Sequence, residues 1–512
     1  MVRRLRSDVR VDVGYADRTV FGSPVGRRPD ENVQRVYAPV LDHVERHGFE
    51  GLVEAGPRLL AQAVDSAAFA EVAEVVQRHW RVHDSVLHPE VALAPPSELA
   101  LVPTSGEGGL QGRFDVGDWP RLHELVSALA GDGVDRARVT GPTAGLVAAL
   151  EQAGMLEDAD VESAPHPDVT ASDLTFVGHN TVVVRSRTSA VVVDPWFAAS
   201  DPADPPGYRP LRLRDVGRVD AVAITHSHPD HFVPSTLLQF HPSTRVIVPR
   251  VERETIMTVG MAERLRELGF TDVVELDWWE SVRVGDIDVV ALPFHGEQAT
   301  DSEQLHPGIR NHGNTYFVRT PDFSAAFLAD SGRDGSGDVR EVAARARQEV
   351  GTPDVLFTGY RGWLTYPVQL LFTSVARSIL LVPRHLWGVR QRLMTTADEA
   401  IDVAETWGAS TVVPYADGGA PWYWRIGLGP RLDELVQEAN GFDPLPERVI
   451  VAARNRTEMP CGLLGSPVRV ALLRPGDSIR RVSSGRDVVR VPGHAWPFRE
   501  QVPTAELAGM LG

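Results

Sequence analysis

The spacing of apolar residues divides the chain into two parts. In the first 165 residues, apolar side chains recur every three or four positions, which is the spacing of amphipathic helices. Helices are predicted at 32–47, 54–64, 68–82, 119–130 and 143–154. No motif that carries chemistry lies among them. We therefore expect 1–165 to form an accessory N-terminal domain of mixed, mainly helical structure.

From residue 174 the pattern changes to short runs of β-branched and apolar residues separated by turn residues, which is typical of strands. Strands are predicted at Leu174–Val177, Thr181–Arg185, Ala190–Val193, Ala221–Ile224, Arg245–Val248, Val273–Leu276, Ser281–Val284 and Ile287–Leu292. Gly285-Asp286 predicts a hairpin between the last two. A helix is predicted at 250–268.

Further along the chain, strands alternate with helices. Strands are predicted at Thr315–Val318, Ala325–Ala329, Val355–Thr358 and Thr411–Pro414, and helices at 338–349 and 396–407. Strands followed by strand–helix alternation indicate an α/β fold in which helices flank the sheets. The segment 447–495 is again β-rich. We expect 431–512 to be a β-rich C-terminal extension packed on the preceding domain.

Composition and charge exclude several classes of function. The chain has 512 residues and a formal net charge of −18, so its surface repels the phosphates of nucleic acids. It contains no lysine, which excludes a Schiff-base lysine and a Walker A site. Cys461 is the single cysteine, so disulfides within the chain and cysteine-based zinc sites are excluded. No long apolar stretch and no signal peptide is recognised, and we expect a cytoplasmic protein without membrane contact.

One short segment carries the strongest chemical signal. The predicted strand Ala221–Ile224 leads directly into His226, His228, Asp230 and His231. Imidazole and carboxylate groups are the natural ligands of Zn, Fe and Mn. Side chains alternate in an extended segment, so His226 and His228 share a face and can bind one ion together. The next two ligands can face a second ion.

This His-x-His-x-Asp-His pattern resembles the signature of the metallo-β-lactamase superfamily. The resemblance covers about 172–430 and implies a catalytic domain built as an αββα sandwich. It also implies that Asp194 does not bind the metal itself but orients the segment that carries His226 to His231. Asp330, in Ala329-Asp330-Ser331, would bridge two metals, and His295 or Glu297 would be the third ligand of the first metal.

The chain departs from hydrolytic members of the superfamily at one place. These carry a last histidine on a late strand, but the matching segment at 411–418 has none, so its ligand is replaced by Tyr415 or Asp417, or by nothing. A carboxylate-rich set with an open position suits iron and O₂. It resembles the diiron monooxygenases of natural-product pathways, the branch that includes the β-hydroxylase of chloramphenicol biosynthesis. In that branch a glutamate is the third ligand, which favours Glu297 over His295.

The resemblance implies a non-heme diiron oxygenase with two Fe ions and O₂ as co-substrate. Its substrate would be a small molecule or an acyl group held as a thioester on a carrier protein or coenzyme A, and an electron donor would be needed. The alternative is a metal-dependent hydrolase of the lactonase or phosphodiesterase type, with two Zn or Mn ions and His295 as ligand. A scaffold without activity is the third hypothesis. The N-terminal domain would either form a homodimer or dock a carrier protein.

Other residues are weaker candidates for the walls of a substrate pocket. Each lies in a loop near a predicted strand end, and each also has an ordinary explanation as a solvated loop residue or a core aromatic. They are His306, His312, Tyr360, Tyr415, Asp417 and Trp422.

Overall fold

The computed structural model describes most of the region from the first predicted β-run onward and parts of the N-terminal region. The described residues are 2–15, 38–47, 51–67, 96–104, 109–113, 118–159, 173–200, 202, 209–228, 230–252, 259–298, 300, 310–362, 364–367, 382, 384–392, 394–416, 446–458, 468–482 and 485–489. Among them, no helix has the length and apolar character that crossing a membrane requires.

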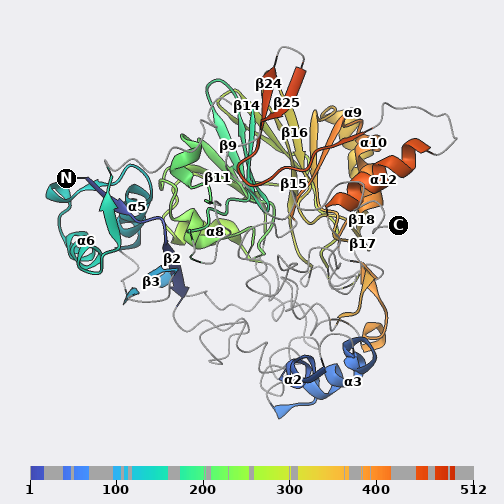
Figure 1. The fold of residues 1–512 in the computed structure, drawn as a ribbon, viewed down its shortest axis with the longest axis horizontal. Helices are drawn as coiled ribbons and strands as arrows, with labels where there is room; N and C mark the ends of the chain where they lie inside the picture. The colour runs from blue at the N-terminus through green and yellow to red at the C-terminus, as the bar shows by residue number, and fades with distance from the viewer. Residues whose placement is uncertain are drawn as a thin grey trace.

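Two large sheets face each other at the centre of the molecule (Figure 1). The first has eight strands in the spatial order β12 (Val273–Leu276), β11 (Arg245–Pro249), β10 (Ala221–Ala223), β9 (Ala190–Val193), β8 (Thr181–Arg185), β7 (Leu174–Gly178), β24 (Ser478–Val482) and β25 (Gly485–Val489). The second has seven, in the order β13 (Ser281–Val284), β14 (Ile287–Pro293), β15 (Asn314–Arg319), β16 (Ser324–Phe327), β19 (Val355–Thr358), β22 (Thr411–Pro414) and β23 (Arg469–Val470). All strands predicted between 174 and 414 are confirmed.

The strands are apolar on both faces because the second sheet covers one face and helices cover the other. In β8, Val182 and Val184 belong to the core between the two sheets, while Val183 belongs to the core on the outer side of the first sheet. A strand that is buried on both faces has no polar alternation, which explains the continuous valines. The second sheet behaves likewise, since Phe357 faces the inner core and Leu356 the outer one. The layers therefore follow the order helix, sheet, sheet, helix.

Helices of each layer lie on the outer sides of the sheets (Figure 1). The first sheet is flanked by α7 (Pro234–Leu237) and α8 (Met261–Glu267), and the second by α9 (Val339–Glu349), α10 (Ala397–Trp407) and α12 (Glu447–Glu458). Thr396 and Glu399 form a capping box at the start of α10, which satisfies backbone donors there. The predictions of helices at 338–349 and 396–407 are confirmed.

Two element predictions are wrong in part. Of the helix predicted at 250–268, the structure describes α8 from Met261 to Glu267, and 253–258 lie outside the described residues. Residue 250 is not helical, because the backbone N–H of Arg250 donates to the Leu276 carbonyl and extends the sheet, and Gly260 directly precedes α8. The segment predicted to be β-rich, 447–495, begins with the helix α12, whose Val449 and Ala452 pack in the outer core of the second sheet. Its later strands are present.

The N-terminal region combines helices and short sheets. Its described elements are β1 (Val2–Leu5), β2 (Val9–Tyr15), α2 (Ala38–His47), α3 (Leu52–Val64), β3 (Pro96–Pro103), β4 (Leu110–Arg113), α5 (Trp119–Ala130), β5 (Val134–Asp135), α6 (Pro142–Gln152) and β6 (Leu156–Asp158). The helices predicted at 54–64, 119–130 and 143–154 are confirmed to within two residues, and the helix predicted at 32–47 is described from Ala38. The helix predicted at 68–82 lies outside the described residues. The two three-stranded sheets in this region were not predicted.

Apolar contacts connect the N-terminal region to the first sheet. Trp119 and Leu129 of α5 belong to the same buried cluster as Val192 and Val246 of the first sheet. The N-terminal region therefore covers part of the outer face of the first sheet. Its boundaries as a separate domain stay a prediction.

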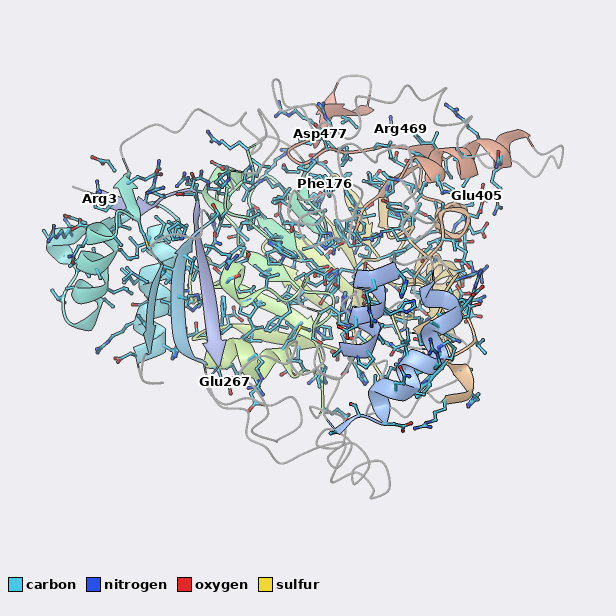
Figure 2. The ribbon with its side chains drawn as sticks, turned by 60° about the horizontal axis from the view of Figure 1, so that its bottom comes forward. Arg3, Phe176, Glu267, Glu405, Arg469 and Asp477 are labelled. Carbon is cyan, nitrogen blue, oxygen red and sulfur yellow. The ribbon has the colours of Figure 1, made fainter. Side chains whose placement is uncertain are left out.

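The C-terminal strands are divided between the two sheets. β23 pairs with β22, and β24 pairs with β7. Figure 2 labels Phe176 and Asp477 at the second of these junctions, where the Phe176 N–H donates to the Asp477 carbonyl at 2.9 Å. The segment 469–489 thus extends both halves of the sandwich.

Candidate metal centre

The segment that carries His226, His228, Asp230 and His231 begins where β10 ends, at the edge of the inner core. His226 forms an isolated antiparallel bridge with Gly313, and the Asn314 N–H donates to the Thr225 carbonyl at 2.8 Å. A Cβ atom on Gly313 would lie 2.9 Å from the Phe294 ring and 3.0 Å from the His226 Cβ. Only glycine allows this close approach, which fixes the backbone of His226 against the second sheet.

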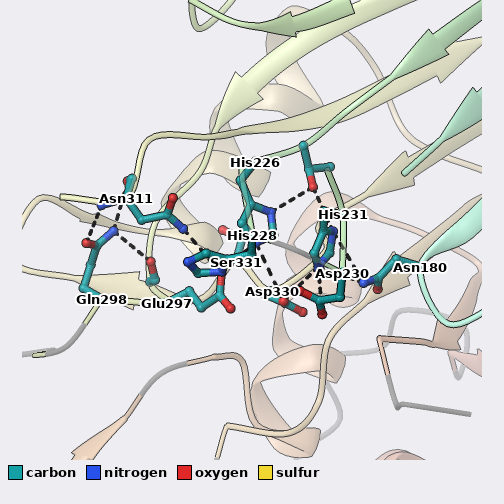
Figure 3. A network of polar contacts seen from close by, with 12 residues as sticks. Asn180, His226, His228, Asp230, His231, Glu297, Gln298, Asn311, Asp330 and Ser331 are labelled. Atoms are coloured by element: carbon teal, nitrogen blue, oxygen red, sulfur yellow. Dashed lines mark hydrogen bonds and ion pairs between the residues drawn. The ribbon is translucent and has the colours of Figure 1, made fainter. Parts of the chain in front are cut away.

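His226, His228 and Glu297 form the first cluster of candidate ligands (Figure 3). Glu297 Oε2 lies 2.8 Å from His226 Nε2 and 2.7 Å from His228 Nδ1. The two imidazole nitrogens are 3.1 Å apart. Glu297 is only 2% exposed and has a φ of 50°, a backbone conformation unusual for a residue with a side chain. This turn aims the carboxylate at the two histidines.

His295 lies in a different environment, although it is only two residues away. Its Nδ1 is 3.1 Å from Ser336 Oγ and 3.8 Å from Asp334 Oδ1, and its ring contacts the edge of Trp278. His295 is absent from every cluster of candidate ligands among the described residues. The geometry therefore separates the two alternatives for the third ligand and places Glu297 beside the histidines.

A second cluster consists of Asp230, His231 and His179. Asp230 Oδ2 lies 3.6 Å from His231 Nε2 and 3.1 Å from His179 Nε2. Asp330 lies between the two clusters, with Oδ2 3.1 Å from His231 Nε2 and 3.9 Å from His226 Nε2. This is the position that a carboxylate shared by two ions requires.

Asp194 supports the second cluster from behind. It is completely buried and accepts hydrogen bonds from the Thr225 N–H and the Thr225 hydroxyl, both at 2.7 Å. Its Oδ2 is also 2.8 Å from His231 Nδ1. When Nδ1–H donates to this carboxylate, the lone pair of Nε2 points toward Asp230 and Asp330.

Burial and charge shift the ionisation of these groups in opposite directions. Burial and the neighbouring histidines hold the pKa of His226 well below its ordinary value. Burial also opposes a charge on His231, but Asp194, Asp230 and Asp330 outweigh it and raise the pKa of His231 well above its ordinary value. The three neighbouring carboxylates therefore favour a positive charge in this site.

The donor set fits a pair of divalent cations. Asp230 Oδ1 and Asp330 Oδ1 are buried and accept no hydrogen bond within the protein. Buried carboxylate oxygens without partners are costly unless a cation compensates them. Histidine nitrogens and carboxylate oxygens together are typical ligands of Fe, Zn and Mn.

Other residues singled out from the sequence lie around this centre or outside the described residues. His312 is exposed, whereas Tyr360 is buried in the outer core of the second sheet. Tyr415 is buried, and its hydroxyl oxygen accepts the Ala329 N–H at 2.7 Å, directly before Asp330. His306, Asp417 and Trp422 lie outside the described residues.

Two residues of the site were missed in the sequence. His179 and Asn180 form the turn between β7 and β8, and the Asn180 amide nitrogen lies 2.8 Å from His231 Nε2. The available signal was a histidine at the end of a predicted strand. It is weak, because His179 is separated from Asp230 by 51 positions and belongs to no local motif.

Comparisons with known proteins support the fold and a metal site. Residues 189–415 match the family model of the beta-lactamase superfamily domain. Over 203 residues the chain is 34% identical to 4-amino-L-phenylalanyl-(CmlP-peptidyl-carrier-protein) 3-hydroxylase of Streptomyces venezuelae, a match that covers 38% of this chain and 35% of that protein. Over 93 residues it is 43% identical to hydroxyacylglutathione hydrolase of Stenotrophomonas maltophilia, covering 17% of this chain and 33% of that one. The chain thus matches about a third of the length of these curated relatives.

A solved structure resembles the chain over nearly its whole length. The crystal structure of CmlA, a diiron beta-hydroxylase from Streptomyces venezuelae, superimposes with a TM-score of 0.59 at 19% identity. The match covers 96% of this chain and 99% of that one. At this identity the likeness establishes a shared fold.

Proposed function

From the premise that residues 189–415 form a beta-lactamase superfamily domain, we propose that this protein is a non-heme diiron oxygenase that hydroxylates an acyl substrate. The observation that carries the proposal is the position of Glu297 between His226 and His228. By the resemblance to the superfamily, this glutamate would take the place where hydrolytic members use a histidine. The likeness to a curated 3-hydroxylase supports the same assignment.

The described residues suggest a division of roles. His226, His228 and Glu297 would hold one iron, Asp230 and His231 the other, and Asp330 would contact both. When bound, two irons would supply the activation of O₂, so that one oxygen atom could enter a C–H bond of the substrate and the other leave as water, with two electrons from an electron donor and two protons. Burial limits the access of water to much of the centre, since His226, His231, Glu297 and Asp330 are each at most 3% exposed. The side chains of His228 and Asp230 are each 14% exposed.

We extend the proposal to a substrate held as a thioester on a carrier protein. The support is the name of the relative from Streptomyces venezuelae, which acts on an amino acid bound to a peptidyl carrier protein. A test compares phenylalanyl-type amino acids loaded on a peptidyl carrier protein with the same free acids. Mass spectrometry with isotopically labelled O₂ should show incorporation of one labelled oxygen atom only into the loaded form.

Metal content separates the proposal from a hydrolase. Protein purified from iron-rich medium should contain two iron atoms per chain and consume O₂ when a chemical reductant is added. Full activity of a zinc-loaded, iron-free protein on lactones or thioesters would reject the oxygenase, and the partial identity to hydroxyacylglutathione hydrolase makes this the alternative to exclude.

Substitutions test the third ligand directly. Glu297→Ala should reduce iron content to at most one atom per chain, because the first cluster loses its carboxylate. The matched control is His295→Ala, which removes a neighbouring imidazole that lies outside the described clusters. Loss of iron from the His295→Ala protein alone would support the hydrolase. The electron donor and a homodimer stay predictions from the resemblance.

A further inference from the structure

His179 lies at the second cluster, on the turn between β7 and β8, which is at the same end of the first sheet as the end of β10. Its side chain is 2% exposed, and Nε2 lies 3.1 Å from Asp230 Oδ2. Its ring is 6.0 Å from the ring of His231, centroid to centroid. His179 therefore places an imidazole beside Asp230 in a chain whose late-strand segment, 411–418, has no histidine.

The turn of His179 is the direct neighbour of the segment that lacks this histidine. The Ala416 N–H, just after β22, donates to the His179 carbonyl at 3.3 Å. This loop after β22 is where hydrolytic members of the superfamily carry their last imidazole. The two loops lie side by side, so an imidazole from one can take the place of an imidazole from the other.

Nitrogen and oxygen donors gather closely in this cluster. One ring nitrogen of His179, one of His231 and a carboxylate oxygen of Asp230 all lie within 4.8 Å of one another. Histidine nitrogens and a carboxylate oxygen at such separations can bind one metal ion together.

The backbone of the turn is held in a costly conformation that aims the ring inward. His179 has a φ of 52°, and the pairing of β7 with β8 shifts register between Phe176 and Gly178. A residue with a side chain rarely adopts this left-handed conformation, because its Cβ then lies too close to the following carbonyl oxygen. Register shifts of this kind redirect side chains beside functional sites.

We propose that Nε2 of His179 is a ligand of the second metal ion and replaces the missing late-strand histidine. The inference rests on the metal centre of the proposed function but not on iron or O₂. It adds a fourth imidazole, after those of His226, His228 and His231, to the candidate ligands.

Cobalt binding tests the inference without any measurement of activity. Apo-protein is titrated with Co²⁺, and proton NMR counts the exchangeable imidazole N–H resonances that the paramagnetic ions shift. The wild type should bind two Co²⁺ and show four such resonances. His179→Ala and His179→Gln should bind the first ion unchanged, bind the second at least about tenfold more weakly, and show three resonances.

The two variants separate a ligand from a residue that only orients Asp230. Glutamine keeps an N–H donor that can reach Asp230 but removes the imidazole. Retention of four resonances and of wild-type affinity in His179→Gln would overturn the proposal. His123→Gln is the matched control, because His123 is a completely buried histidine on α5, where its Nε2 pairs with the Phe240 carbonyl; it should keep all four resonances.

The outcome is independent of the oxygenase assignment. A protein that proves to be a zinc hydrolase would still lose one resonance on substitution of His179 if the inference is correct. Conversely, a diiron oxygenase whose His179 variants keep both ions and all resonances would retain its function and refute the ligand.

Discussion

A single buried carboxylate, Asp194, determines the orientation of His231. It binds the backbone and the hydroxyl of Thr225 and the Nδ1 of His231. Asp194→Asn keeps the shape of the side chain but removes an acceptor. We expect the affinity for the second metal ion to fall about 10–100-fold, because the imidazole loses its fixed orientation. Competition with a coloured chelator measures this.

The affinity for the first ion provides the internal control for Asp194→Asn and should fall less. Asp194 holds His231 directly, whereas it reaches His226 through the Thr225 hydroxyl, which lies 3.0 Å from His226 Nδ1. A control variant, Asp354→Asn, removes a carboxylate that binds Ser324 at the far end of β16. It should leave both affinities unchanged. Equal weakening by both variants would mean that general destabilisation is the cause.

Tyr415 shapes the turn that presents Asp330. Its hydroxyl oxygen accepts the N–H of Ala329, which has a φ of 47°. Tyr415→Phe leaves this buried N–H without its acceptor, so we expect the free energy of unfolding to fall by about 1–3 kcal/mol. Urea denaturation of the apo-protein measures the change. An unchanged free energy would show that the turn holds without this hydrogen bond.

At the scale of elements, the strands could be predicted and some helices could not. Runs such as Thr181–Arg185 are short, β-branched and bounded by turn residues, and burial on both faces leaves them no other structure. The run at 447–458 contains valines and isoleucine but forms α12, because packing on α10 overrides a weak preference. Sequence alone does not show this tertiary contact.

The helix α5 carries a buried histidine that links stability to pH. Burial lowers the pKa of His123 to about 4, although Nε2 pairs with the Phe240 carbonyl. The folded state thus prefers the neutral ring, and stability falls as the pH drops from the unfolded pKa of 6.5 toward 4. Between pH 6.5 and pH 5 this group should cost about 2 kcal/mol.

Replacement of His123 tests this contribution. His123→Gln does not titrate, so the free energy of unfolding of the variant should decline about 2 kcal/mol less than that of the wild type between pH 7 and pH 5. Urea denaturation at both pH values, with metal removed, gives the comparison. Identical declines in both proteins would assign the acid sensitivity to other groups.

At the scale of the whole molecule, the sequence indicated most, but not all, of the residues that the structure brings together in the candidate metal centre. His226, His228, Asp230 and His231 lie within six positions and follow a strand, so local spacing reveals them. Glu297 could be chosen over His295 only through a resemblance, because both follow the same strand. His179 could not be found, because only the pairing of distant strands brings it to Asp230.

The C-terminal strands cover an edge strand in each of the two sheets. A chain that ends at residue 430 loses β23, β24 and β25 and exposes the edges of β22 and β7. Open strand edges pair with other chains, so we expect this truncation to form large aggregates. Size-exclusion chromatography with light scattering detects them. A chain that ends at Val489 keeps all three strands and should elute like the full chain; identical behaviour of both truncations would contradict the expectation.

The position of β24 near the end of the sequence has a consequence for folding during translation. Among the described residues, the three candidate metal clusters lie between His179 and Asp330, whereas β24 begins at Ser478. Translation of the roughly 150 residues in between takes on the order of ten seconds. During that interval the nascent chain presents its histidines and carboxylates in an unfinished sandwich. We therefore expect cellular metal supply during translation to influence which ion the protein acquires.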